Sequence, residues 1–214
     1  MRYYFDFLSP YAYLAWHDLK PLALELDRTI EPKPILLAGL LNHWEQRGPA
    51  EIAPKRRFVY KDVIRRAAER GLPLEGPASH PFRPLSALRV SLPEVSGAEQ
   101  VRVIDALFAA SWGSGGEIGT DQGVATALNN VGLDGAALVA KASTPEVKNA
   151  LRLATERALD EGVFGVPTVI VDGELVFGHD RLKDVRAVVE GRDTVDDQKL
   201  DAMLARPASA QRVR

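Results

Sequence analysis

The stretch that decides the fold is FDFLSPYAYL, Phe5 to Leu14. The aromatic run that leads into it, Met1 to Leu8, is typical of a short β-strand. Ser9 is a favoured N-cap residue, and Pro10 is tolerated in the first turn of a helix, where its missing N–H costs nothing. A strand followed at once by a helix is therefore predicted, with the helix ending near Asp27.

The segments on either side extend this unit into a sheet. Ile30 to Leu37 alternates and then becomes apolar, which predicts a second strand and an opening β-α-β unit. Near the other end of the chain, Val166 to Val171 is apolar and β-branched, Asp172-Gly173 is a hairpin turn, and Glu174 to Phe177 is the return strand. Asp180 to Val189 closes the unit as a helix. Together these segments predict one four-stranded sheet.

A helical block interrupts this sheet between about Leu40 and Asp160. Helix-like patterns occupy Lys55 to Arg70, Ser86 to Val95, Glu99 to Trp112, Thr120 to Val131 and Pro145 to Glu161. The fold class is α/β with a large all-helical insertion. We expect residues 1–38 and 162–190 to form the sheet domain and residues 39–161 the helical domain. Residues 191–214 are expected to be a polar, frayed tail.

Composition narrows the function. A formal net charge of −2 gives no reason to expect nucleic acid as a partner. No basic and apolar leader opens the chain and no apolar stretch approaches the ~20 residues of a membrane span, so we expect a soluble cytoplasmic protein without a membrane partner. The spacing of His17, His43 and His80 does not suggest a metal site, so structural or surface roles are predicted for them.

The chain contains no cysteine. Disulfides, thiolate metal sites and disulfide oxidoreductase activity are therefore excluded. Any sulfur chemistry at this protein needs the sulfur of a ligand.

Several motifs, in order, resemble one family. They are FDFLSPYAYL, GPAEIAPKR (Gly48–Arg56), YKDVIRRAAERGLPL (Tyr60–Leu74), HPFRPLSALR (His80–Arg89), the Trp112–Asp121 segment and GVFGVPTVIVDGELVFGHDRL (Gly162–Leu182). The set resembles the 2-hydroxychromene-2-carboxylate isomerases, relatives of the kappa-class glutathione transferases. This resemblance implies a thioredoxin-like fold of the DsbA-like form. Where that fold carries a redox Cys-x-x-Cys, this chain has Ser9-Pro10-Tyr11-Ala12.

The resemblance implies a glutathione-dependent isomerase of aromatic compound catabolism. Reversible addition of the glutathione thiolate would allow cis/trans isomerisation of an aromatic unsaturated keto acid, and the protein would be a homodimer. Two alternatives remain. One is a kappa-like glutathione transferase or peroxidase that consumes the thiol, and the other is a catalytically silent thioredoxin-fold protein that binds a peptide or small ligand.

Ser9 is the predicted catalytic residue. Unsatisfied N–H groups and a partial positive charge at a helix N-terminus favour an anion such as a thiolate, and a serine hydroxyl can donate a hydrogen bond to it. By resemblance the thiolate is that of glutathione. From spacing alone, a simple N-cap role explains Ser9 better than a catalytic one.

The resemblance also implies a cis peptide bond at Val166-Pro167, where the Val166 backbone pairs with the cysteinyl part of glutathione. Without it, Pro167 could simply begin an edge strand. His179, Asp180 and Lys55 are expected to hold the two ends of glutathione. His179 stands where relatives carry Ser or Gln. The alternatives are an N-cap role for Asp180 and a solvated helix face for Lys55.

The second substrate is expected above the sulfur, against the helical block. The residues predicted to contact it are Tyr11, Phe82, Arg83 and Trp112, with Trp44 as a further aromatic side chain. Aromatic faces and one cation suit an aromatic keto acid. Aromatic residues at helical spacing also commonly belong to the core. Arg83 and Gly48-Pro49 stand where relatives carry Asn.

Overall fold

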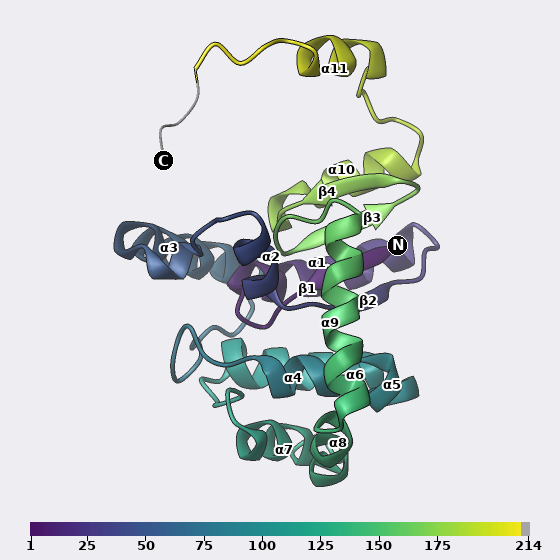
Figure 1. Cartoon of the computed structure of the whole chain (residues 1–214). Helices are drawn as coiled ribbons and strands as arrows, with labels where there is room; N and C mark the ends of the chain where they lie inside the picture. The colour runs from purple at the N-terminus through teal and green to yellow at the C-terminus, as the bar shows by residue number, and fades with distance from the viewer. Residues whose placement is uncertain (211–214) are drawn as a thin grey trace.

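A computed structural model describes residues 1–210 of the chain. Within them lies one mixed sheet in the order β2-β1-β3-β4 (Figure 1). β1 is parallel to β2 and antiparallel to β3, and β3 and β4 form an antiparallel hairpin. The strands are β1 (Arg2–Phe5), β2 (Glu31–Pro34), β3 (Thr168–Val171) and β4 (Glu174–Phe177). This confirms the predicted sheet and its long helical interruption.

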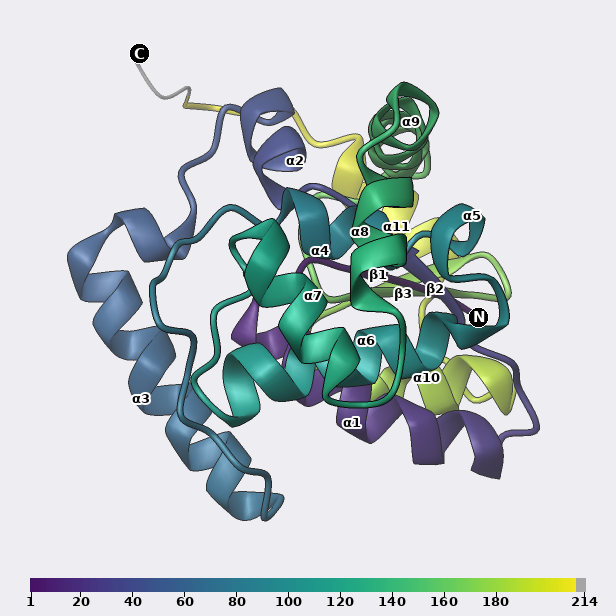
Figure 2. The same cartoon turned by 90° about the horizontal axis from the view of Figure 1, so that it is seen from below.

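Helices cover the sheet and make up the long segment between β2 and β3. They are α1 (Pro10–Glu25), α2 (Leu37–His43), α3 (Ala53–Glu69), α4 (Leu85–Val90), α5 (Pro93–Ser96), α6 (Gln100–Phe108), α7 (Asp121–Asn129), α8 (Gly135–Ala142), α9 (Pro145–Asp160), α10 (Leu182–Val189) and α11 (Asp197–Leu204). Single turns are η1 (Pro49–Glu51), η2 (Gly97–Glu99), η4 (His179–Arg181) and the π-type turn η3 (Ala109–Gly113). Figure 2 shows α4, α6, α7 and α8 grouped over the sheet.

The side chains of β1 alternate between the two faces of the sheet, as the period of a strand requires. Tyr3 and Phe5 join a large core cluster with α1, α10 and the helical block. Tyr4 points the other way, into a smaller cluster with Leu40 of α2 and Ala158 of α9. Both faces of the sheet are therefore covered by helices.

The larger core runs without a break from the sheet into the helical block. Phe7, just after β1, lies 4.7 Å from the ring of Phe108 in α6. Trp16 of α1 donates a 2.6 Å hydrogen bond to Asp105 of α6. Residues 1–38 and 162–190 contain the strands, and residues 39–161 contain most of the helices. The apolar side chains of both parts pack into one core.

Three helices were not predicted from the sequence. α2 is short, and α8 begins with Gly135, a poor helix former, although Asp134 caps it by accepting the Ala137 N–H at 2.9 Å. In the tail, α11 is capped by Asp196, so the prediction of a frayed segment is wrong for that helix. Residues 211–214 of the predicted tail lie outside the described residues. No helix in residues 1–210 is long and apolar enough to cross a bilayer.

Candidate active site

Ser9 sits at the junction of the sheet and α1. Its Oγ accepts the Ala12 N–H at 3.2 Å, which makes it the N-cap of α1, as predicted. The same hydroxyl lies 3.4 Å from the carbonyl oxygen of Val166. That distance is long for an O–H donor, so the proton of Ser9 is held loosely and is available to a better acceptor.

Val166 faces Ser9 from the segment before β3. The Val166–Pro167 peptide bond is cis, as the resemblance implied. Within residues 1–210 the Val166 N–H makes no hydrogen bond, whereas the Pro167 carbonyl accepts the Gly178 N–H at 3.0 Å. β3 lies between β1 and β4, so Pro167 does not begin an edge strand and that alternative is wrong. The N-terminus of α1 therefore carries a loosely held hydroxyl, and the residue whose carbonyl contacts this hydroxyl has an unpaired N–H.

Asp6 holds this turn in place, a role that the sequence analysis missed. The side chain is fully buried, and its two carboxylate oxygens accept the N–H groups of Leu8 and Leu37, each at 2.9 Å. Its own carbonyl accepts the Ser9 N–H at 3.0 Å. Burial raises the pKa of the Asp6 carboxyl to about 7, against the two hydrogen bonds, which lower it. The signal in the sequence was an acidic residue inside the apolar run FDFL.

Asp6 makes stability depend on pH. Because its pKa in the folded protein is about 7 and its ordinary value is 3.8, the folded state keeps a proton that the unfolded chain has lost between those values. The free energy of unfolding should therefore fall as pH rises through this window, by up to about 1 kcal/mol per pH unit from this group. Urea unfolding at several pH values should show this slope, and Asp6→Asn should flatten it. Parallel curves for the two proteins would contradict the assignment.

Tyr11 and His179 form a second cluster beside Ser9. Their rings stack at 4.6 Å with an angle of 17° between the planes, and the Tyr11 hydroxyl donates to Asp62 of α3 at 3.0 Å. His179 is only 8% exposed, and its buried Nδ1 has no hydrogen-bond partner within residues 1–210. Burial lowers the pKa of His179. The structure thus places Tyr11 with a predicted glutathione residue rather than with the other predicted substrate residues.

Asp180 lies next to His179 and is exposed. Its carboxylate accepts a 2.8 Å hydrogen bond from Arg181 and makes no capping bond, because Gly178 is the N-cap of η4. The N-cap alternative for Asp180 is therefore wrong. Gly178 has φ +107°, and a Cβ there would lie 2.8 Å from an oxygen of Asp180, so the turn requires glycine.

A groove of about 360 Å³ opens at this cluster. His179 and Asp180 form part of its wall. The charged residues that complete it are Asp18, Glu25, Arg70, Lys183 and Arg186. A groove with both signs of charge suits a zwitterionic group.

Lys55 lies in the first turn of α3 and is exposed. It makes no hydrogen bond or ion pair within the described part of the chain, which leaves it free to reach a carboxylate. Gly48, where relatives carry Asn, instead donates its N–H to Glu51 at 2.6 Å.

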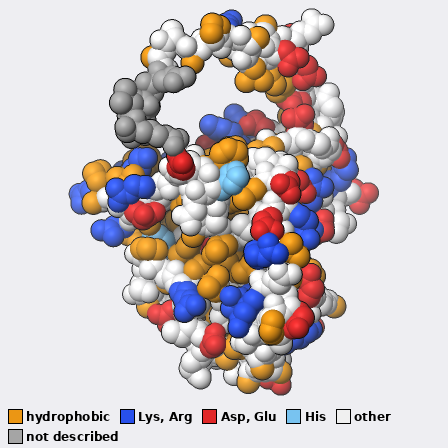
Figure 3. Space-filling model, in the orientation of Figure 1, with side chains coloured by type: hydrophobic (Ala, Val, Ile, Leu, Met, Phe, Trp, Pro, Cys, Tyr) orange, Lys and Arg blue, Asp and Glu red, His pale blue; other side chains and the backbone are white. Residues whose placement is uncertain are grey.

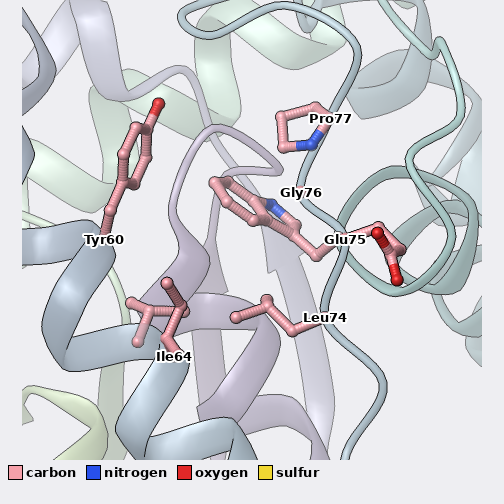
Figure 4. Close-up of a pocket in the computed structure, with 8 residues that line it drawn as sticks. Tyr60, Ile64, Leu74, Glu75, Gly76 and Pro77 are labelled. Atoms are coloured by element: carbon pink, nitrogen blue, oxygen red, sulfur yellow. The ribbon is translucent and has the colours of Figure 1, made fainter.

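A separate pocket of about 270 Å³ lies between α3 and the segment Leu74–Pro77 (Figure 4). Tyr60 and Ile64 project from α3 on one side, and Leu74 and Pro77 lie on the other. Trp112 also lines the pocket. Its carbonyl accepts the N–H groups of Glu75 and Gly76, each at 3.0 Å, so the π-type turn η3 holds that wall.

Trp112 is therefore the predicted substrate residue that lines this pocket. Phe82 is half-buried and Arg83 exposed, on the loop before α4, where Phe82 lies close to Gly119. Trp44 is 45% exposed beside His43. Figure 3 shows apolar side chains gathered near the middle of the front face, with Lys and Arg side chains below them.

His80 has a more specific position than the predicted structural or surface role. Its Nε2 lies 2.9 Å from the carbonyl oxygen of Leu8, and its Nδ1 lies 3.0 Å from the hydroxyl of Tyr60. Its ring packs edge-on against Trp112 at 5.3 Å. Because Leu8 precedes Ser9, His80 connects the pocket to the turn that carries Ser9. His80 begins the motif HPFRPLSALR, but nothing in that motif indicated its contacts with Leu8 and Tyr60.

Comparison with known proteins supplies the family. The signature of the DSBA-like thioredoxin domain matches residues 1–190. The chain belongs to the DSBA-like thioredoxin family. The 2-hydroxychromene-2-carboxylate isomerase of Sphingobium xenophagum is 32% identical over 183 residues, which cover 84% of this chain and 92% of the relative.

Two further matches support the same family. Glutathione S-transferase kappa 2 of Caenorhabditis elegans is 30% identical over 200 residues, covering 86% of this chain and 89% of the relative. A solved structure of 2-hydroxychromene-2-carboxylate isomerase superposes with a TM-score of 0.79 at 27% identity, covering 96% of this chain and 98% of the other. The predicted fold and the resemblance to this isomerase family are therefore confirmed.

Proposed function

We propose that the protein is a glutathione-dependent isomerase that interconverts cis and trans forms of an aromatic unsaturated keto acid in aromatic compound catabolism. One observation carries the proposal. At the position of a redox cysteine, the loosely held hydroxyl of Ser9 lies at the N-terminus of α1 against the carbonyl of Val166, whose own N–H is unpaired within residues 1–210. Such a set of donors suits a thiolate from outside the chain, because the chain itself has no cysteine.

The residues fit glutathione. The unpaired Val166 N–H suits the backbone of its cysteinyl residue, in the manner of an added strand. His179, whose buried Nδ1 is unpartnered within residues 1–210, and Asp180 both line a groove with both signs of charge, which suits the γ-glutamyl end. Lys55 is free for the glycyl carboxylate. Tyr11 stacks on His179 and so helps to position the residues that would hold the γ-glutamyl end.

Glutathione bound here supplies a thiolate that adds reversibly to an unsaturated carbon, so that the neighbouring bond can rotate. The Ser9 hydroxyl donates a hydrogen bond to the sulfur and stabilises the anion, which lowers the pKa of the thiol. Val166 and Pro167 orient the sulfur toward the helical block. Trp112 presents an apolar wall to the aromatic ring of the substrate, and Phe82 and Arg83 supply a further ring and a cation for the keto acid.

The second candidate is a kappa-like glutathione transferase or peroxidase. The match to glutathione S-transferase kappa 2 supports it, and the same Ser9 site would serve. Net loss of glutathione during turnover distinguishes it from the isomerase, which regenerates glutathione. A silent binding protein is the third candidate. For either enzyme we propose a cytoplasmic homodimer.

Glutathione binding should depend on Lys55 and Asp180. Since both side chains are exposed, each replacement by alanine should weaken binding about fivefold to tenfold, or about 1 kcal/mol. Calorimetric titration of glutathione into each variant measures this. Lys61→Ala is the matched control, because Lys61 is an exposed lysine on the same helix. If Lys55→Ala and Asp180→Ala bound as the wild type does, the silent scaffold would be favoured.

A further inference from the structure

Tyr60, His80 and the Leu8 carbonyl form a continuous chain of hydrogen bonds from the pocket to the turn that carries Ser9. The first bond joins the Tyr60 hydroxyl and His80 Nδ1 at 3.0 Å, and the second joins His80 Nε2 and the Leu8 oxygen at 2.9 Å. The three groups come from α3, from the Pro-rich loop and from the turn between β1 and α1.

The direction of both bonds follows from their chemistry. A backbone carbonyl can only accept, so the hydrogen of the neutral imidazole must sit on Nε2. Nδ1 is then an acceptor, and the Tyr60 hydroxyl donates to it. Burial lowers the pKa of His80 and the positive charge of Arg56 adds to this, against the bond to Leu8, so the environment favours the neutral ring. Arg56 also lowers the pKa of Tyr60, although burial raises it overall.

The Tyr60 side chain also lines the 270 Å³ pocket (Figure 4). Its only hydrogen is directed to His80, so the lone pairs of its oxygen remain for a donor. Trp112, against which His80 packs, lines the same pocket. The pocket therefore combines an apolar aromatic wall with a hydrogen-bond acceptor that can pass a proton onward. An aromatic ligand that carries a hydroxyl group matches both features.

We propose that Tyr60 and His80 are a proton relay for the hydroxyl group of the aromatic substrate. The proposal rests on the proposed isomerase function and adds its acid–base group. The substrate O–H bond breaks as its proton passes to the Tyr60 oxygen, and the Tyr60 proton passes to His80 Nδ1. The electron pair stays on the substrate oxygen, and His80 becomes an imidazolium whose two N–H groups are both satisfied. The reverse transfer returns the proton.

The relay is needed where the keto acid closes onto its own phenolic oxygen or opens again. Closure joins that oxygen to the keto carbon, and the phenolic proton ends on the former keto oxygen. A group that holds this proton between the two oxygens lowers the barrier, typically by 10²-fold to 10⁴-fold in rate. Tyr60 is the catalytic residue because it faces the substrate. His80 is a positioning residue that acts through Tyr60.

The test compares two reactions of each variant. Tyr60→Phe should lower kcat for glutathione-dependent turnover of 2-hydroxychromene-2-carboxylate by about 100-fold. The same variant should conjugate 1-chloro-2,4-dinitrobenzene, which has no hydroxyl group, within about twofold of the wild type, since no relay is needed. His80→Gln keeps an acceptor for Tyr60 but cannot take a proton. His80→Gln should therefore lose turnover. Its kcat/KM should also no longer fall at low pH, because the group that becomes protonated there is gone.

Tyr4→Phe and His43→Gln are the controls, because both residues lie outside the pocket and the turn. Both should behave as the wild type. Equal losses of Tyr60→Phe on both reactions would show a structural role and overturn the relay. Unchanged turnover would overturn it too.

A second measurement needs no isomerase activity. Nitrogen NMR of the His80 ring during titration with 4-nitrophenol should show Nδ1 gaining a proton in the wild type and not in Tyr60→Phe. Failure of 4-nitrophenol to bind, or binding without this change, would overturn the relay while leaving the glutathione site intact. Protonation of Nδ1 in a protein without isomerase turnover would support the relay and reject the proposed function.

Discussion

Ser9→Ala should lower glutathione-dependent turnover by about 10- to 150-fold. This is the worth of a hydrogen bond from a neutral donor to a charged acceptor, about 1.5–3 kcal/mol. Without the hydroxyl, the pKa of the bound thiol rises and less thiolate is present at neutral pH. The ultraviolet absorbance of the thiolate, followed against pH in wild type and variant, measures this pKa directly.

The same replacement removes the N-cap of α1, so stability needs its own control. Loss of a cap costs typically about 1 kcal/mol. Thr120 caps α7 in the same way, by accepting the Gly123 N–H at 3.1 Å, and it lies outside the site. Thr120→Ala should therefore cost similar stability and leave turnover intact. If it slowed turnover as much as Ser9→Ala, the effect of Ser9 would be structural.

Trp112→Ala should have the largest effect on stability, about 3–5 kcal/mol. The indole is 2% exposed, and its N–H donates to the Phe7 carbonyl at 2.8 Å, so truncation leaves both a cavity and an unpaired buried acceptor. Because Trp112 also lines the pocket, substrate binding should be lost with it. Urea unfolding and turnover measured on the same preparation test both effects.

Trp112→Phe separates the two roles of this residue. It keeps an apolar ring in the pocket and removes the hydrogen bond to Phe7. We expect a loss of about 1–3 kcal/mol in stability, from the unpaired carbonyl, with substrate affinity largely kept. Equal stability of Trp112→Ala and the wild type would show that the indole is not part of the core.

Local chemistry explains why much of the fold was predictable. Ser9-Pro10 can start a helix, and Asp172-Gly173 can form the tight turn in which both residues have positive φ. For the strands and helices next to such signals, the predicted ends lie within a few residues of the observed ends. α2 and α8 were missed because they are short, and α11 because its segment is polar. Their stability depends on caps and packing, which a periodic pattern does not record.

The residues of the site were predictable only where they lie in a motif that resembles the isomerase family. Ser9 and Val166 are 157 residues apart in the chain, and only the ordered family motifs indicated that they belong to one site. The structure places the Ser9 Oγ 3.4 Å from the Val166 carbonyl oxygen. Tyr60 and His80 each begin one of the ordered motifs, but those motifs did not indicate that the two side chains touch, because their contact depends on the path of the Pro-rich loop. Asp6 was passed over because its two partners are backbone N–H groups, which any sequence provides.

The central claim is that a bound thiol does the chemistry that the chain, without cysteine, cannot do. The most direct test is the interconversion of 2-hydroxychromene-2-carboxylate and its open-chain isomer, followed by absorbance with and without glutathione, with total thiol assayed at the end. We predict turnover only with glutathione, and no net loss of thiol. Turnover at the same rate without glutathione would contradict the claim, and stoichiometric loss of thiol would make the protein a transferase.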